Sequence, residues 1–540
     1  MKSIWKWLLL FIVLIGIFLR FYQLGNNPAS LTWDEVAWGY NAYSLGIDGK
    51  DEFGRFLPHD YLESFGDFKP PMYAYLDIVP IKAFGLNEFG TRFPSAFFGV
   101  LTIVATYFLV IEIFGEESQA LALLSSLFLA ISPWHINLSR AAFEANISSF
   151  FIVAGVWFFM AFVRGKRFFL PLSVAAFTLS LYTFNTGRVV APLLLILLSI
   201  CFKNILLKNK KIFFIAFFTG LILLLPTLKF LLSPQANLRF REVNIFSDPS
   251  IVATSNLEIQ NDNNAFWSKI LHNRRLEYGV SFVKHYFDNL NPSFLFIKGD
   301  GNPKFSTQDV GQMYLWDMPF FLLGCFLLFR KKKGYWWIIP LWLLIGIIPA
   351  GTARETPHAL RTETTLPTFQ IITAFGCLWF LGLFKKVWTR KIIIGALGFL
   401  LFLNLIYYLH GYYKHYPRIY SGEWQYGYKE SIRYVQTVQS KYERINITNE
   451  LGRPYIYYLF YTKTDPTLFR REANVQRDTF GFVDVASVGK YYFDKDPNSL
   501  KNIKGKTLYI NTAGALPKNA NILKTFYLLN GSPVLFAYTL

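Results

Sequence analysis

The stretch Trp7-Leu-Leu-Leu-Phe-Ile-Val-Leu-Ile-Gly-Ile-Phe-Leu19 is an unbroken apolar run between Lys6 and Arg20. Such a run is typical of a helix that crosses a bilayer, with basic residues on its cytoplasmic flank. No small-residue cleavage site follows it, so we interpret it as a retained first membrane helix and not as a signal peptide. The start of the chain therefore predicts a membrane protein.

Apolar runs recur along the first three quarters of the chain. They begin near Trp7, Phe93, Gln119, Asn146, Phe168, Val189, Ile212, Met313, Trp336, Thr365 and Ile392. Of the 540 residues, 53% are hydrophobic and 19% aromatic, more than a soluble protein of this length can bury. The sequence predicts a multi-pass α-helical membrane protein with about 11 transmembrane helices.

The formal charge of +19 is concentrated between the apolar runs. The basic clusters are Lys2/Lys6, 164–167, 203–211, 330–333 and 385–391. They occupy every second linker except the one at 112–118, as the positive-inside rule expects of cytoplasmic loops. We therefore predict a plasma-membrane protein that contacts membrane lipids and no nucleic acid. Its N-terminus is expected in the cytoplasm and its C-terminal segment outside.

This topology divides the chain into two predicted domains, a transmembrane domain at 1–410 and an extracytoplasmic α/β domain at 411–540. The outer loops 25–92 and 233–312 belong to the first domain. The tail has helical periodicity at 428–442, and its strand-like runs are 444–448, 481–485, 507–511, 523–529 and 534–538.

The strongest candidate for chemistry is Trp33-Asp34-Glu35 in the first outer loop. It opens a helix-like aromatic run, 36–45, which we expect to lie in the membrane interface. Adjacent carboxylates suit removal of a proton from a hydroxyl, or binding of a divalent cation (Mg, Mn or Zn) with Asp34 as its ligand. The alternative is a structural role, because Asp34 or Thr32 can also cap a helix.

Basic residues of the outer loops are candidates for binding a phosphate. Lys69 follows Asp67 and precedes Pro-Pro, which favours a helix start and so a phosphate site; a lysine snorkelling to the headgroups is the alternative. His358 and Arg361 lie between two late spans, where Arg could bind a lipid-linked phosphate or ordinary headgroups. Arg92 could be a headgroup anchor. We interpret His135, Arg140 and Glu144 as structural support for the first loop.

Together these motifs resemble the membrane glycosyltransferases of the GT-C fold, in particular family 39 with its protein O-mannosyltransferases and lipid A aminoarabinose transferases. The matching stretches are Leu31-Thr-Trp-Asp-Glu-Val-Ala-Trp-Gly-Tyr40, Phe68-Lys-Pro-Pro-Met-Tyr73, Gly90-Thr-Arg-Phe-Pro-Ser-Ala96, Pro133-Trp-His-Ile-Asn-Leu-Ser-Arg140 and Pro357-His-Ala-Leu-Arg361. The aminoarabinose transferases have an acidic residue directly before Lys-Pro-Pro, where this chain has Phe68 and Asp67 comes one residue earlier. Asp67 and Arg92 are further candidate support residues of the site.

The resemblance implies a hexosyl- or pentosyltransferase that moves a sugar, with inversion, from a polyprenyl-phosphate donor to a lipid, glycan or protein acceptor. It implies that Asp34 is the base, supported by Glu35, and that Lys69, Arg361 and His358 bind the donor phosphate. Two other functions stay open: a lipid or glycan transporter, and a non-catalytic envelope-assembly protein. The charge-poor centres of the spans argue against the transporter.

Overall fold

The computed structural model describes residues 3–233, 236, 244–477, 483–500 and 505–540. Contacts divide the chain into two compact units. Unit 1 consists of Met1–Arg20, Phe97–Ser139 and Glu144–Tyr408, and unit 2 consists of Phe21–Ala96, Arg140–Phe143 and Leu409–Leu540. The first outer loop therefore belongs to the same unit as the C-terminal tail. The division into a domain at 1–410 and a separate domain at 411–540 stays a prediction.

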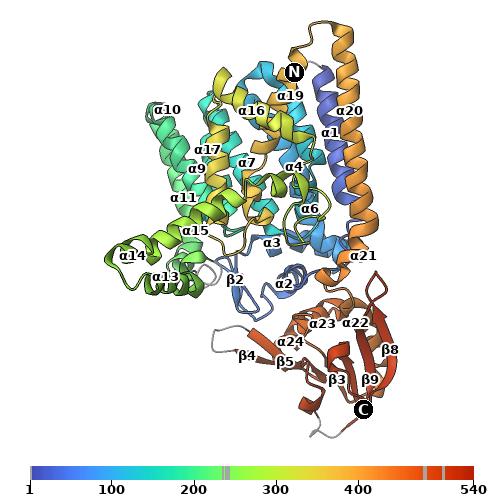
Figure 1. The fold of residues 1–540 in the computed structure, drawn as a ribbon. Helices are drawn as coiled ribbons and strands as arrows, with labels where there is room; N and C mark the ends of the chain where they lie inside the picture. The colour runs from blue at the N-terminus through green and yellow to red at the C-terminus, as the bar shows by residue number, and fades with distance from the viewer. Residues whose placement is uncertain (1–2, 234–235, 237–243, 478–482, 501–504) are drawn as a thin grey trace. The chain divides into compact units, whose positions relative to one another are not determined.

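The membrane part of the chain is helical (Figure 1). Its helices are α1 (Ser3–Phe21), α4 (Glu88–Phe114), α5 (Gln119–Ile131), α6 (Pro133–Ser139), α7 (Glu144–Val163), α8 (Phe169–Leu181), α9 (Gly187–Cys201), α10 (Lys203–Lys208), α11 (Lys210–Leu231), α16 (Asp317–Lys331), α17 (Ile338–Gly351), α18 (Ala359–Thr362), α19 (Thr368–Gly382) and α20 (Val387–His410). In the segment between α11 and α16, which is predicted to be an outer loop, lie α13 (Pro249–Asn261), α14 (Phe266–Leu271) and α15 (Arg274–Asp288).

Five helices of the described chain are long and apolar enough to cross a membrane, or up to seven if two bent helix pairs each count as one span. The predicted count of about 11 spans is not confirmed. A helix lies at or beside each predicted position, but α8, α9 and α17 have only 10–17 residues. At 1.5 Å per residue, such helices fall short of the hydrocarbon thickness of about 30 Å.

Helices α16 and α19 pack through glycines. A Cβ atom at Gly324 would lie 2.0 Å from the carbonyl oxygen of Ile372, and one at Gly376 would lie 2.0 Å from that of Phe320. Only glycine lets the two backbones approach this closely, as in many packed membrane helices. These two positions therefore fix the spacing of the pair.

Unit 2 combines the first outer loop with a seven-stranded mixed sheet. The loop forms α2 (Trp33–Asp48), the hairpin β1 (Leu62–Ser64) and β2 (Asp67–Lys69), and α3 (Met72–Phe84). The tail forms α21 (Tyr416–Tyr420), α22 (Tyr428–Val438), β3 (Arg444–Ile447), α23 (Pro454–Thr462), α24 (Pro466–Glu472), β4 (Ala473–Arg477), β5 (Val483–Val488), β6 (Tyr491–Tyr492), β7 (Thr507–Asn511), β8 (Asn521–Tyr527) and β9 (Pro533–Thr539). The strand order is β4-β5-β6-β3-β7-β9-β8, with β3 parallel to β6 and β7.

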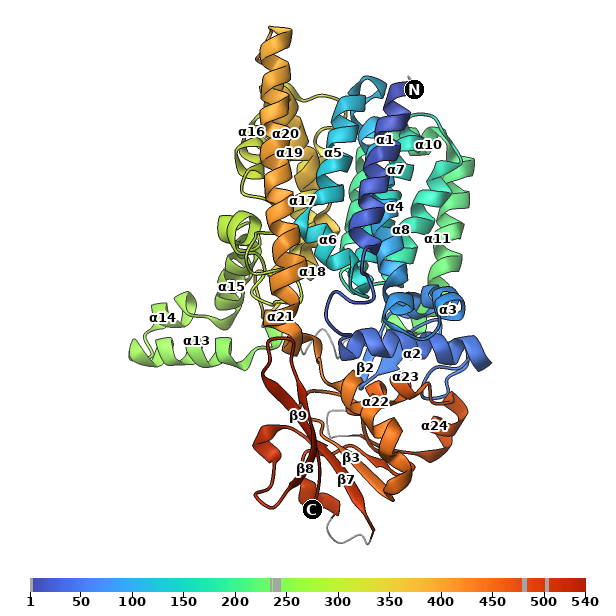
Figure 2. The ribbon, with the colours of Figure 1, turned by 90° about the vertical axis from the view of Figure 1, so that its right-hand side faces the viewer.

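Each strand-like run predicted in the tail corresponds to a strand, although residues 481 and 482 lie outside the described residues. The prediction missed β4, β6, α23 and α24. Helix α23 packs against both α2 and β5, and Figure 2 shows it between α2 and the sheet.

One hydrophobic core joins the outer loop to the tail. Val36, Ala37 and Tyr40 of α2 are buried in the same cluster as Ile445 and Tyr457 of the tail. The expectation that residues 36–45 place their aromatic side chains in the lipid interface is therefore wrong, because the tail covers them. The tail is part of the structure that holds the first loop in place.

Candidate active site

Helix α2 begins with a capping box. The Thr32 side chain accepts a hydrogen bond from the Glu35 N–H at 3.4 Å, and the Glu35 carboxylate accepts one from the Thr32 N–H at 2.9 Å. These two bonds satisfy N–H groups that the first turn of a helix leaves without helical partners. Thr32 is thus the N-cap, and the Asp34 side chain stays 49% exposed.

The neighbouring carboxylate, Glu35, is fully buried. Its Oε1 accepts hydrogen bonds from Arg92 Nε and from the Ala142 N–H, each at 2.9 Å. The Arg92 side chain is also completely buried, so the two charges form an ion pair closed to water. Glu35 therefore joins the start of α2 to α4 and to segment 140–143, and substrate in solution cannot reach it.

Arg92 also holds the chain ahead of α2. Its guanidinium donates to the carbonyl oxygens of Leu24 at 3.1 Å, Pro28 at 2.9 Å and Ser30 at 2.5 Å. A planar guanidinium with several donors suits such a set of acceptors. The interpretation of Arg92 as a headgroup anchor is wrong, because a completely buried side chain cannot contact lipid headgroups.

Lys69 lies at the end of β2, and its ammonium contacts the Asp34 carboxylate. The Lys69 side chain is 10% exposed, and its Nζ lies 5.3 Å from the centre of the Trp38 ring and 5.5 Å from that of Phe65. Aromatic faces attract a cation and exclude water from it. The structure thus brings together the two residues that the sequence singled out as base and phosphate ligand.

Asp67 begins the same short strand and pairs with Ser64 across the hairpin. Residues two apart on a strand point to the same face, so Asp67 and Lys69 share one face of β2. Lys69 precedes α3 by three residues, with Pro70 and Pro71 between, as the Pro-Pro motif predicts.

The sequence analysis missed a buried acidic pair, Asp51 and Glu52. Glu52 is fully buried, and burial together with the charge of Asp51 raises its pKa to about 8, while the positive charge of Lys69 partly opposes the shift. Burial also raises the pKa of Asp51. The available signal was a second Asp-Glu pair in the same loop, which resembles an ordinary polar turn when only the sequence is considered.

His358 and Arg361 lie in unit 1, at the start of α18. The His358 ring stacks on Phe305 with centroids 5.1 Å apart, and its backbone N–H donates to Asn289 Oδ1 at 2.9 Å. Burial and the charge of Arg361 lower the pKa of His358 to about 3. Its imidazole is therefore neutral near pH 7 and brings no positive charge to a phosphate.

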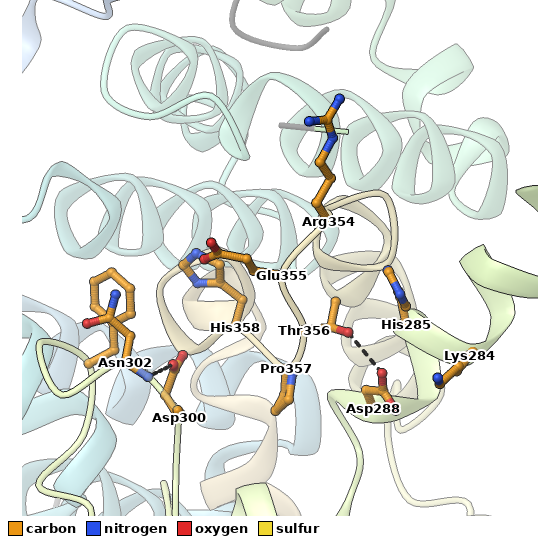
Figure 3. A pocket seen from close by; sticks show the side chains of 12 residues that line it. Lys284, His285, Asp288, Asp300, Asn302, Arg354, Glu355, Thr356, Pro357 and His358 are labelled. Carbon is orange, nitrogen blue, oxygen red and sulfur yellow. Dashed lines mark hydrogen bonds between the residues drawn. The ribbon is translucent and has the colours of Figure 1, made fainter. Parts of the chain in front are cut away.

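A polar cavity of about 420 Å³ adjoins His358 in unit 1 (Figure 3). Its lining combines cationic, acidic and amide side chains: Lys284, His285, Asp288, Asp300, Asn302, Arg354, Glu355, Thr356 and His358. Thr356 donates to Asp288 at 2.8 Å, as the dashed line in Figure 3 shows. Burial raises the pKa of Asp300 to about 6, and its Oδ2 accepts from the Ala359 N–H at 2.6 Å. The sequence analysis named only His358 among these residues.

The predicted support residues lie in different places. Arg140, in unit 2, is buried and donates to the Asn27 carbonyl oxygen at 2.9 Å and to Tyr412 Oη at 3.2 Å. His135 is buried in unit 1, with its Nδ1 2.5 Å from Arg20 Nη2. Glu144 lies in the first turn of α7. Of the three, Arg140 contacts the first loop directly.

Comparison with known proteins gives two kinds of likeness. Residues 68–230 match the family model described as dolichyl-phosphate-mannose-protein mannosyltransferase. An uncharacterized protein of Aquifex aeolicus is 32% identical over 186 residues, which are 34% of this chain and 35% of that protein. The match thus spans about a third of that relative's own length.

The fold is similar to that of ArnT from Cupriavidus metallidurans. The apo crystal structure has a TM-score of 0.57 at 13% identity, and the structure bound to undecaprenyl phosphate has a TM-score of 0.53 at 13% identity. Both comparisons cover 99% of this chain and 98% of ArnT. The family match confirms the resemblance to family 39 of the GT-C glycosyltransferases for residues 68–230, and the fold of nearly the whole chain is similar to that of ArnT.

Proposed function

We propose that this chain is a glycosyltransferase that moves a sugar from a polyprenyl-phosphate donor to an acceptor hydroxyl on the outer side of the membrane. The contact between Asp34 and Lys69 carries the proposal. It joins a half-exposed carboxylate, able to take a proton, to a cation suited to a phosphate leaving group. The match to a mannosyltransferase family and the likeness to a protein crystallised with undecaprenyl phosphate support the same donor class.

In the proposed reaction, the Asp34 carboxylate removes the proton of the acceptor hydroxyl. The acceptor oxygen then attacks the anomeric carbon and forms the new glycosidic bond. The bond between that carbon and the phosphate oxygen breaks, and the polyprenyl phosphate leaves with the bonding electron pair. Attack opposite the leaving group inverts the anomeric centre. Glu35 acts as a positioning residue, because its buried ion pair fixes the first turn of α2.

Lys69 would exchange partners when the donor binds. Its ammonium contacts Asp34 in the free protein, and the phosphodiester of a bound donor is a competing anion whose negative charge grows as its bond to the sugar breaks. Transfer of Lys69 to the phosphate would release Asp34 as a base only when donor is present. This coupling of donor binding to the release of Asp34 would prevent Asp34 from acting as a base when no donor is bound.

Arg361 is the proposed second phosphate ligand, because Arg binds phosphate through paired hydrogen bonds. His358 would take part through hydrogen bonding from a neutral ring, since its pKa is lowered to about 3. The proposed activity is that of a hexosyl- or pentosyltransferase, because the proposed contacts to the phosphate are the same for either sugar.

A cation at Asp34 fits the residues poorly. In the free protein the Asp34 carboxylate contacts the Lys69 ammonium, and Glu35 is committed to Arg92 and to backbone N–H groups. Among the described residues, the one group of three His, Cys, Asp or Glu side chains close enough to share a metal does not include Asp34. We therefore assign no catalytic step to a metal.

The proposal is tested with detergent-purified protein and a panel of synthetic polyprenyl-phosphate sugars. A bound donor raises the unfolding temperature by mass action. Polyprenyl alcohols of the same chain length are the matched controls, because they lack the phosphate. Stabilisation by a phosphate-linked sugar alone is expected. Equal stabilisation by the alcohols would contradict a phosphate-directed site and favour the transporter alternative, in which lipid recognition suffices.

A further inference from the structure

The predicted outer loop between α11 and α16 carries a second cluster of chemically active side chains, all in unit 1. Glu258 on α13, His272 after α14 and Glu277 on α15 each offer one ligand atom, and these three atoms lie within 4.8 Å of one another. The three side chains are partly buried. Figure 1 shows the three helices in green.

From this geometry we propose that His272, Glu258 and Glu277 bind a divalent transition-metal ion, with zinc the best match. His272 Nδ1 lies 2.6 Å from Glu258 Oε2 and 3.7 Å from Glu277 Oε1. One ring nitrogen carries at most one proton, so a neutral or charged imidazole donates from Nδ1 to one carboxylate only. A divalent cation binds the nitrogen and both carboxylates together and offsets the repulsion between the two acids.

The other ring nitrogen supports this assignment. His272 Nε2 lies 3.5 Å from Asp262 Oδ2, and Asp262 in turn accepts a hydrogen bond from Ser268 Oγ at 2.7 Å. Metal-binding histidines typically direct their second nitrogen to a carboxylate, which fixes the ring orientation and raises its basicity. Asp262 is therefore a positioning residue for the metal ligand His272.

The spacing of the three ligand atoms suits an ion with tetrahedral coordination. Ligand atoms about 2.0–2.2 Å from zinc lie roughly 3.3 Å apart, so the Glu258 and Glu277 oxygens need only small side-chain rotations. Three protein ligands leave a fourth position for water. The backbone is already held, because the Ser255 hydroxyl donates to the His272 carbonyl oxygen at 2.5 Å and the His272 N–H donates to the Ser268 carbonyl oxygen at 2.8 Å.

The proposed ion would fasten α13 and the end of α14 to α15. Helix α15 is also the helix that contributes Lys284, His285 and Asp288 to the polar cavity. The metal would thus stabilise one wall of that cavity from the far end of the helix. Metal binding itself does not depend on the proposed transferase activity.

The test uses the full chain in detergent, without an affinity tag and stripped with a chelator. Zinc is titrated in competition with a chromophoric chelator. We expect one zinc site in the wild type that His272→Ala and Glu277→Gln remove, and Asp262→Asn should weaken it by about 10- to 100-fold. His59→Ala is the matched control, because His59 is exposed in the first outer loop and should leave the affinity unchanged.

Calcium and magnesium are the comparison probes, because they prefer oxygen ligands and gain little from an imidazole. Zinc affinity that is equal in the wild type and His272→Ala would overturn the proposal, as would a wild type that binds no zinc. The proposal would also be overturned if calcium bound as tightly as zinc and His272→Ala did not change this binding. Such a site would consist of carboxylates alone.

Discussion

Asp34 and Glu35 are neighbours in the chain, yet the Asp34 side chain is 49% exposed while that of Glu35 is completely buried. The first contacts Lys69 and the second is paired with Arg92 at 2.9 Å. The two carboxylates therefore lie in different surroundings, and we expect Asp34 to contribute to chemistry and Glu35 to folding.

Replacing Glu35 should mainly destabilise the protein. Glu35→Gln leaves the buried Arg92 charge without its counter-ion, and breaking a buried pair costs about 3–5 kcal/mol. We expect a clear fall in the unfolding temperature, measured by thermal denaturation in detergent. Asp34→Asn, at the half-exposed neighbour, should unfold close to the wild-type temperature. An inactive Glu35→Gln protein with wild-type stability would instead place Glu35 in the chemistry.

Replacing Lys69 should weaken donor binding. Hydrogen bonds to charged groups contribute about 1.5–3 kcal/mol, so Lys69→Ala should bind a polyprenyl-phosphate donor roughly 10- to 100-fold less tightly. Titration of the donor against thermal stability measures the loss. Lys82→Ala removes an exposed lysine from nearby α3 and serves as the control. Donor affinity unchanged in Lys69→Ala would mean that another cation binds the phosphate.

Glu52 should make stability depend on pH. Its pKa is about 8 in the folded protein and lies near 4.5 in the unfolded chain, so the folded state binds the proton more tightly. The free energy of unfolding then falls as pH rises from 4.5 to 8, by at most about 1.4 kcal/mol per unit. The loss is complete above pH 8. Glu52→Gln should unfold with a weaker pH dependence in that window, whereas parallel curves for the two proteins would refute the assignment.

Removing the tail should disable the first loop. Tyr457 Oη donates to the Leu31 carbonyl oxygen at 2.9 Å, and Tyr40 Oη donates to that of Thr464 at 3.1 Å, within the shared core. A chain ending at residue 410 keeps Asp34 and Lys69 but exposes the core around α2. We expect proteolysis within 31–45 and loss of transfer. A truncated protein that transfers sugar and resists protease would show that the loop folds without the tail.

The sequence singled out Asp34 and Lys69, which the structure places in contact, but it did not reveal the contacts that support them. Asp34 and Lys69 could be recognised because each lies beside the start of a helix, where a charged side chain commonly has a function. The difference between Asp34 and Glu35 could not be predicted, because the burial of Glu35 depends on Arg92, 57 residues away, and on Ala142. Contacts of this range leave no periodic pattern in the sequence.

Hydropathy located the helices, while the predicted count of about 11 spans is not confirmed. Some apolar runs form helices that are too short to cross a bilayer at 1.5 Å per residue, such as α8 with 13 residues and α9 with 15. The helices of the tail were difficult to predict because their apolar faces pack against distant parts of the chain. Helix α23 is apolar because it packs against α2 and β5, and neither of these elements is adjacent to it in the sequence.

The most direct test of the proposed function compares Asp34→Asn with Asp60→Asn in a transfer assay with a donor that stabilises the protein. Asp60 is an ion-paired carboxylate of the same loop, 2.8 Å from Arg55, and so is the matched control. A general base contributes about 10²–10⁴-fold to a rate, so Asp34→Asn should lose at least about 100-fold while Asp60→Asn stays near the wild type. Transfer by folded Asp34→Asn protein at the wild-type rate would contradict the account.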